Sequence, residues 1–283
     1  MQKLPFPLHR RAERAVISVS GPDAADFLQN LVTADIAGLA EGKAAYAALL
    51  QPQGKILFDF FIVNLGERYA MDCSAAQRDE LLKKLNHYKL RAKVTIEASE
   101  EDVGVAFMRP DSGIAYADPR AAQLGLRVIA PKGSLPAETE NPYRGARIRL
   151  GLGDSDADLG SGELFPHEAN LDQLGAIGMS KGCYIGQEVV SRMEHRGTAR
   201  SRILPVYVSG GAPAKGSEIK ANGKTIGTLL SSDGSDALAL IRLDRLKDAV
   251  EANDALLTEG TPVRVRKPHW VRYEVAMPPE EED

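Results

Sequence analysis

The sequence predicts an α+β protein with antiparallel sheet, followed by a small β-barrel. In the first two thirds of the chain, short apolar runs alternate with amphipathic stretches, and residues 51–54 resemble a hairpin connection between two such runs. After Gly197 only short strand-like runs follow, with Asn222-Gly223 as a strong two-residue hairpin signal. The 283 residues, 43% hydrophobic and 26% charged, suffice for two or three compact units. The order of elements favours antiparallel pairing over a doubly wound parallel sheet.

Two helices are expected in the first half of the chain. Pro22 at a first helical position starts a helix that ends near Leu31. Ser74 is expected to cap a second helix, whose apolar stripe comprises Leu81, Leu82, Leu85 and Tyr88. Strands are expected at 15–20, 44–50, 56–63, 68–73, 93–97, 103–108 and 126–129.

Residues 151–164 form a stretch rich in Gly, Asp and Ser that is interpreted as a connector, with an active-site lid as the minority alternative. They match neither G-x-G-x-x-G nor Walker A, so nucleotide binding has little support. The barrel strands are expected at 203–208, 218–220, 225–230, 237–241, 263–266 and 270–275. This predicts an α+β region over 1–199, built from two interleaved subdomains, a barrel over 200–277 and a disordered acidic tail over 278–283.

Composition narrows the classes of function. A net charge of −4 gives no reason to expect nucleic-acid binding, and the sequence holds no run of 18 apolar residues that would predict a membrane span. Two cysteines 110 positions apart favour a reducing compartment, and a cytoplasmic location is predicted. Two cysteines and five scattered histidines cannot cage an iron–sulfur cluster or a structural zinc, so no resident metal is expected.

The most informative stretch is Lys181-Gly182-Cys183-Tyr184-Ile185-Gly186-Gln187-Glu188, just before a predicted helix. Glycines beside a reactive side chain allow close approach of a ligand. A thiol near a helix N-terminus and a cation is shifted toward the nucleophilic thiolate. The alternative is that Cys183 is a small buried apolar residue on a glycine-rich turn.

This octapeptide resembles the Lys-Gly-Cys-Tyr-x-Gly-Gln-Glu motif of the YgfZ family, the folate-binding, iron–sulfur-related branch of the glycine-cleavage T-protein (aminomethyltransferase) superfamily. Three further blocks look like that family: 16–35, Leu49-Leu50-Gln51-Pro52-Gln53-Gly54-Lys55-Ile56, and Phe165-Pro166-His167-Glu168-Ala169-Asn170-Leu171. The resemblance spans about residues 5–200. It implies a T-protein-like fold, including a ferredoxin-like subdomain and the superfamily's C-terminal barrel, and it implies tetrahydrofolate as the cofactor.

A folate site needs polar groups for the pterin edge and cations for the glutamyl tail. Gln187 and Glu188 could face the pterin, or Glu188 could simply favour a helix start. A local basic cluster could clamp the tail, or belong to a solvated face; it comprises Arg192, His195, Arg196, Arg200 and Arg202. The expected folate contacts are completed by Lys181, Tyr184 and the weaker candidate Arg149.

Asp59 stands on an apolar run, where a carboxylate is costly unless it is paired or functional, although alternation could place it on a wet face. The resemblance implies that aminomethyltransferases carry an adjacent acidic pair here. In this chain the first of the two positions is Phe58 and only Asp59 is acidic. This departure, with the cysteine motif, favours the YgfZ branch over aminomethyl transfer.

The first hypothesis is therefore a tetrahydrofolate-binding protein that supports assembly or repair of iron–sulfur enzymes, with Cys183 as a reactive thiolate. Its expected partners are folate and iron–sulfur assembly proteins or client enzymes, and neither nucleic acid nor membrane. The second is a folate-dependent aminomethyl or one-carbon transferase with Asp59 as general base. The third is a non-catalytic folate sensor or interaction protein.

Overall fold

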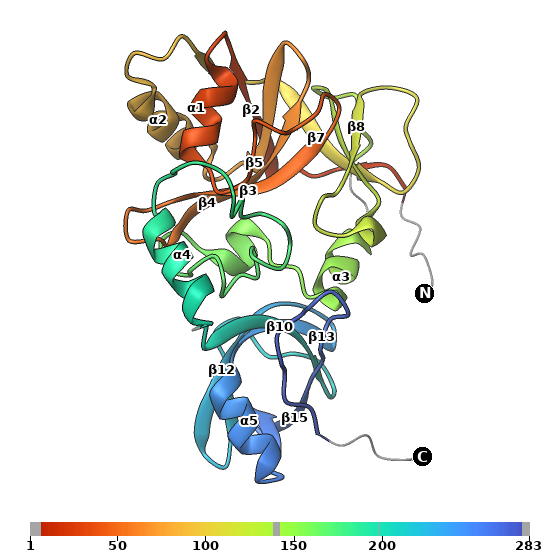
Figure 1. The fold of residues 1–283 in the computed structure, drawn as a ribbon. Coiled ribbons are helices and arrows are strands. Elements are labelled where there is room, and N and C mark those ends of the chain that lie inside the picture. The colour runs from red at the N-terminus through yellow and green to blue at the C-terminus, as the bar shows by residue number, and fades with distance from the viewer. Residues whose placement is uncertain (1–6, 138–141, 198, 279–283) are drawn as a thin grey trace.

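The computed structural model describes residues 7–137, 142–197 and 199–278. Two antiparallel sheets form the upper body in Figure 1, and a closed barrel with one helix lies below them. Helices α3 (Pro142–Arg149) and α4 (Gln187–Arg196) lie at the level between the two. The predicted α+β architecture with a C-terminal barrel is confirmed.

The first sheet has five antiparallel strands in the order β3-β4-β5-β2-β6. Their bounds are β2 Arg14–Ser20, β3 Ala44–Leu50, β4 Ile56–Asn64, β5 Arg68–Ser74 and β6 Thr95–Ala98. On one face, helices α1 (Ala24–Leu31) and α2 (Arg78–Lys89) bury an apolar core with Phe58, Phe60 and Ile62. The opposite face carries Phe61 and Val63 into a second core shared with the segment that leads to α4.

The predicted hairpin is present, because β3 pairs with β4 from Ala44↔Val63 to Leu50↔Ile56. Both helices begin later than expected. Helix α1 begins at Ala24 after Asp23, and α2 begins at Arg78, because Ser74 Oγ accepts a 3.3 Å hydrogen bond from Gln77 N and so stabilises the turn before the helix.

The second sheet has four strands in the order β1-β7-β9-β8. Their bounds are β1 His9–Arg10, β7 Glu101–Ala106, β8 Ile114–Ala117 and β9 Leu126–Pro131, with the 3-10 turn η1 at Ala122–Leu124. Strands β1 and β8 were not predicted. Each is short and pairs on one side only, so neither shows a long apolar alternation.

The barrel is closed in the order β10-β13-β12-β11-β14-β15. Its elements are β10 Ser201–Val208, β11 Glu218–Ala221, β12 Lys224–Asp233, β13 Asp236–Arg242, α5 Leu243–Glu251, β14 Leu256–Thr258 and β15 Thr261–Val265. Asn222 and Gly223 turn between β11 and β12 with φ of +46° and +75°, as the hairpin signal predicts.

The strand predicted at 270–275 is wrong. This segment is irregular, and its side chains tie the end of the chain to the centre of the molecule. Trp270 Nε1 donates to Leu150 O at 2.8 Å, and Tyr273 Oη donates to Asn170 Oδ1 at 3.0 Å. Of the predicted acidic tail, 278–283, all but the first residue lies outside the described ranges.

Candidate functional site

The octapeptide lies at the start of α4 and packs on the tip of the β3–β4 hairpin. Gly186, with φ of +79°, precedes the helix, and a Cβ on it would lie 2.6 Å from Gln51 O. A Cβ on Gly54 would lie 2.7 Å from Val189 Cβ. Only glycine fits at these two positions, so the hairpin and the cysteine motif form one unit.

Cys183 is exposed and forms no disulfide, whereas Cys73 is buried in β5. Burial raises the pKa of the Cys73 thiol to about 12, so this thiol is inert at neutral pH. Cys73 therefore belongs to the core. Cys183 is therefore the accessible thiol of this chain.

Lys181 has a buried side chain that anchors the motif. Its Nζ donates to Val32 O and Ala34 O, both at 2.7 Å, at the C-terminal end of α1. Burial lowers the pKa of Lys181 to about 8, with Asp35 opposing that shift. The ammonium is engaged by protein carbonyls, which positions the motif; a folate contact of Lys181 stays a prediction.

Tyr184 and Gln187 also make contacts within the octapeptide. Tyr184 is buried beneath Lys181 Nζ, which lies 5.2 Å from its ring centroid, and burial raises its pKa to about 12. Gln187 Oε1 accepts a 3.3 Å hydrogen bond from Tyr184 N. These contacts fix the backbone on both sides of Cys183.

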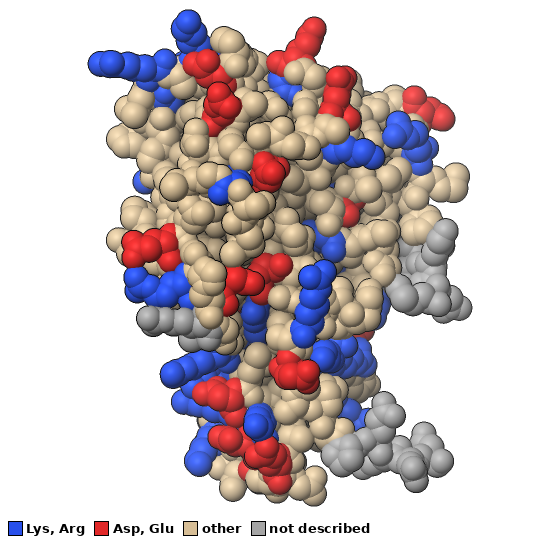
Figure 2. Space-filling view, viewed as in Figure 1, with Lys and Arg blue, Asp and Glu red and all other residues tan. Residues whose placement is uncertain are grey.

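The charged candidates do not gather around one site. Glu188 and Arg192 form a 2.7 Å ion pair on the outside of α4, with side chains 85% and 56% exposed. Arg149 lies 3.5 Å from Asp236 on the barrel, and Arg200 lines a separate cavity below α4. Both signs of charge are interspersed on the face shown in Figure 2, without one basic patch.

Asp59 is buried on β4, on the sheet face opposite Phe58. Its Oδ2 accepts a 2.9 Å hydrogen bond from Tyr46 Oη, and Ser155 also hydrogen-bonds to it. Burial raises the pKa of Asp59 despite the opposing charge of Arg14. The wet-face alternative is wrong, and the carboxyl is paired within the core.

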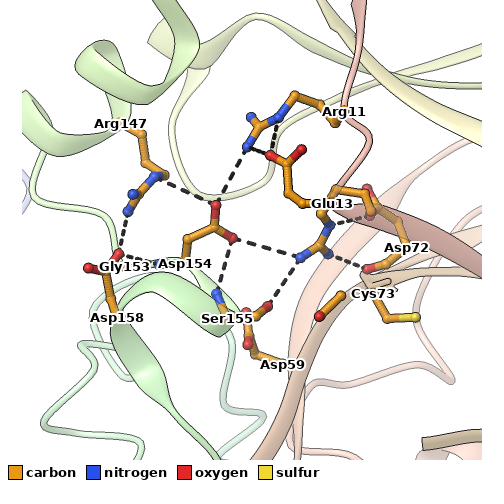
Figure 3. Close-up of polar contacts among 12 residues, drawn as sticks. Arg11, Glu13, Asp59, Asp72, Cys73, Arg147, Gly153, Asp154, Ser155 and Asp158 are labelled. Carbon is orange, nitrogen blue, oxygen red and sulfur yellow. Dashed lines mark hydrogen bonds and ion pairs between the residues drawn. The ribbon is translucent and has the colours of Figure 1, made fainter. Parts of the chain in front are cut away.

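Around Asp59 lies a buried network of arginines and aspartates, part of which Figure 3 draws. It joins the two sheets through the contact of Arg127 on β9 with Asp72 on β5. Asp72 on β5 accepts from Arg14 Nε at 2.8 Å and from Arg127 Nε at 2.7 Å. Burial alone would raise the pKa of Asp72, but Arg127 and Arg14 outweigh it and hold the pKa below its ordinary value. Sequence reasoning missed this network, although Asp72 on an apolar strand gives the same signal as Asp59.

Residues 151–164 are not a plain connector. They contain a π-helical turn, η2 (Ser155–Leu159), whose Ser155 and Asp158 side chains enter the buried network. Asp158 Oδ2 accepts from Arg147 Nη1 at 2.7 Å, and Asp154 lies 3.7 Å from both Arg11 and Arg147. The surrounding guanidinium groups keep the pKa of Asp154 far below its ordinary value, although burial opposes this.

A cavity of about 380 Å³ opens beside this network and is named here the arginine cavity. It is lined by Arg11, Glu13, Arg14, Arg144, Arg147, Asp154 and Ala157. Four guanidinium groups against two carboxylates make the lining basic. Arg11 is buried over the Tyr143 ring at 4.3 Å, and its Nη1 has no partner among the described atoms. This cavity is suited to an anionic group.

One group of described side chains has metal-ligand chemistry. His167, Asp172 and Glu194 bring one ligand atom each within 4.8 Å of the others. However, His167 Nε2 already pairs with Glu194 at 3.0 Å, and Asp172 lies 2.5 Å from the Arg202 guanidinium. A cation here would adjoin that positive charge, so the geometry does not favour a metal.

Comparisons with known proteins agree with this fold. Residues 13–112 match the model of the GCVT N-terminal domain, and residues 200–273 match that of the CAF17 C-terminal beta-barrel domain. The crystal structure of glycine cleavage system aminomethyltransferase T from Bartonella henselae superposes with a TM-score of 0.72 at 16% identity, over 94% of this chain and 86% of that one. The predicted T-protein-like fold is confirmed.

Two relatives of this chain are both named as iron–sulfur cluster assembly factors. The iron-sulfur cluster assembly factor IBA57 homolog of Chaetomium globosum is 33% identical over 87% of this chain and 74% of its own length. The human iron-sulfur cluster assembly factor IBA57 is 30% identical over 83% of this chain and 77% of its own length. Both are named mitochondrial, which overturns the predicted cytoplasmic location; unpaired cysteines indicate a reducing environment but do not identify the compartment. In the described ranges, no helix has the length and apolar character needed to cross a bilayer.

Proposed function

Since the chain belongs to the family of the iron–sulfur cluster assembly factor IBA57, we propose that it serves iron–sulfur cluster assembly through the thiolate of Cys183. The names of the relatives support a mitochondrial setting. The octapeptide further supports placement within the YgfZ-like branch of the superfamily. The observation that carries the proposal is the contrast between the exposed Cys183 and the buried Cys73.

Because only one thiol of this chain is accessible, the protein can offer a cluster a single cysteine ligand. A cluster is ordinarily held by four thiolates, so Cys183 supplies one ligand and other proteins supply the rest. Transfer proceeds by ligand exchange: the Cys183 thiolate binds an iron while another ligand leaves, and the exchange itself changes no oxidation state. The cluster is thus cargo, and its donor or acceptor is the partner.

We propose tetrahydrofolate as the second ligand of the protein, with its glutamyl carboxylates in the arginine cavity. Four guanidinium groups and the unpartnered Arg11 Nη1 support this placement. The earlier assignment of folate contacts to Glu188, Arg192, Arg200 and Arg149 remains an alternative prediction, and it names residues outside this cavity.

The decisive experiment measures two properties of each variant: tetrahydrofolate binding by calorimetry and support of iron–sulfur enzyme activity in cells that lack the protein. Cys183→Ser should abolish the support and leave folate binding unchanged. Arg11→Gln should weaken folate binding about tenfold, because it removes a charged donor. Full enzyme support by Cys183→Ser would refute the role of the thiol. Unchanged folate affinity in Arg11→Gln, with loss in Arg192→Gln, would favour the alternative contacts.

Folate-dependent group transfer is the second candidate, and the raised pKa of Asp59 is the observation that favours it. Asp59→Asn should then stop turnover while Cys183→Ser stays active. The contacts of Asp59 with Tyr46 and Ser155 instead support a structural role. A sensor without chemistry predicts that neither variant affects iron–sulfur enzymes.

A further inference from the structure

A second cavity, of about 460 Å³, lies where the 167–173 segment, the end of α4 and the barrel meet. Its walls include His167, Asp172, Glu194, Arg200, Arg202 and Tyr273. Arg11, Arg14 and Arg147 line the arginine cavity and not this one. It is named here the Arg202 cavity.

Arg202 is held in a fixed orientation at this cavity. Its side chain is 8% exposed, and Nη1 donates to His167 O and to Asp172 Oδ1, both at 2.5 Å. The guanidinium carbon lies 4.4 Å from the centroid of the Tyr273 ring. The guanidinium plane is therefore set before any ligand arrives.

The other edge of the same guanidinium is unused. Arg202 Nε is buried and has no hydrogen-bond partner among the described residues, and its hydrogen bonds within this part of the chain all come from Nη1. The Nε–Nη2 edge presents two parallel N–H donors, the geometry that binds a carboxylate or phosphate through two oxygens. A buried donor without a partner is costly, so this edge favours an acceptor.

Two of the four acidic side chains that line the cavity, Asp172 and Asp244, are ion-paired with an arginine. Asp172 accepts from Arg202 and, at 2.7 Å, from Gln173 Nε2. Glu194 pairs with His167 at 3.0 Å. Asp244 pairs with Arg242 at 2.6 Å, which leaves Glu194 and the exposed Glu274 without an arginine partner. Arg200 adds a second, exposed guanidinium to the same lining.

We propose that the Arg202 cavity binds a small oxyanion, a carboxylate or a phosphate group, through the Nε–Nη2 edge of Arg202, with Arg200 as a supporting charge. The site is separate from Cys183 and from the arginine cavity, so the proposal does not depend on the thiol role or on the folate placement proposed above; it shares only Arg200 with the alternative folate contacts. Its failure would leave the proposed function untouched.

The test follows the arginine ¹⁵Nε–¹Hε signals of the full chain by NMR during titration at constant ionic strength. The probes are inorganic phosphate and succinate. We expect the Arg202 signal, assigned by its absence in Arg202→Lys, to shift saturably with at least one probe. Arg202→Lys keeps a cation beside Asp172 but lacks the two-donor edge, and it should weaken binding about tenfold. Arg200→Gln should weaken binding about twofold to fivefold, since its charge is exposed.

Arg264→Gln is the matched control, because Arg264 is exposed on β15 and lines neither cavity. It should bind like the parent. A shift with phosphate alone or with succinate alone would support the site and identify the preferred oxyanion. No shift of the Arg202 signal with either probe, or unchanged affinity in Arg202→Lys with its fold intact by circular dichroism, would overturn the proposal.

Discussion

Gly54 and Val189 are in contact so close that a single methyl group on Gly54 would lie 2.7 Å from Val189 Cβ. Gly54 ends the turn between β3 and β4 with φ of +83°, and Val189 lies in the first turn of α4. The hairpin tip therefore sets the position of the helix that directly follows Cys183.

Gly54→Ala should destabilise the protein by about 2–5 kcal/mol, because it combines a left-handed backbone strain with overpacking. Gly133→Ala is the matched control: Gly133 has φ of +77°, but nothing lies within 4 Å of its added Cβ. The control should cost only the backbone strain, about 1–2 kcal/mol. Urea denaturation measures both, and equal losses would contradict the close packing of hairpin and helix.

The two cysteines should differ in their rate of reaction with a thiol reagent. Cys183 should react rapidly with a disulfide reagent at pH 8, whereas Cys73 should react only after unfolding, since it is buried with its pKa raised to about 12. The native protein should show one fast thiol, and Cys183→Ser should show none. A fast thiol that survives in Cys183→Ser would mean that β5 opens under native conditions.

Asp72→Asn should destabilise the protein by about 3–5 kcal/mol, because Arg14 and Arg127 would keep buried charges without their carboxylate. Glu100→Gln is the control, since Glu100 pairs with Lys132 at the surface, and it should change stability little. Guanidinium chloride denaturation measures both variants. A loss no larger than that of the control would mean that the network does not support the junction of the sheets.

Lowering the pH should destabilise the protein through the carboxylate of Asp72. The pKa of folded Asp72 lies below its ordinary value, so its contribution is present above the unfolded pKa of about 3.9 and is lost as pH falls through the folded value. Parent stability should therefore fall below about pH 4. The fall should be shallower in Asp72→Asn, measured by thermal unfolding at stepwise pH. Parallel curves would assign acid sensitivity to other groups.

Lys181→Met should cost about 1–3 kcal/mol, because Val32 O and Ala34 O lose their buried donor. The folded pKa of Lys181 is lowered to about 8, so between about pH 8 and 10.4 the unfolded chain binds a proton that the folded chain has released. Stability of the parent should gain from this group as pH rises through that window. Lys181→Met should lack this gain in stability between about pH 8 and 10.4, measured by urea denaturation at stepwise pH. The control variant Lys215→Met, at an exposed position, should keep it. A gain that persists in Lys181→Met would exclude Lys181 as its source.

Local patterns predicted much of the fold. The β3–β4 hairpin, the Asn222-Gly223 turn and most barrel strands follow from periodicity and turn chemistry within short windows. Helix α3 escaped prediction because Gly145 and three arginines interrupt any apolar stripe. Its burial comes from contacts with the barrel and with η1, which no local window contains.

The site was predicted only in part. The octapeptide correctly singled out an exposed thiol, because glycines and a cysteine at a helix start form a contiguous signal. The buried network was missed because its ion pairs join positions far apart, such as Arg14 and Asp72 across 58 residues. The grouping of Glu188 with Arg149 and Arg200 followed from sequence proximity or charge alone, and the fold separates them.

The shared carboxylate of Asp72 also has an evolutionary consequence. Arg14 belongs to one sheet, Arg127 to the other, and Tyr116 Oη donates to the same carboxylate at 3.0 Å. Replacement of Asp72 removes a partner from two buried guanidinium groups and one hydroxyl at once, whereas replacement of Arg14, Arg127 or Tyr116 leaves Asp72 with its other partners. Asp72 should therefore be the slowest of these positions to change, and its replacement should be tolerated best when the two arginines are replaced with it by apolar residues of similar volume.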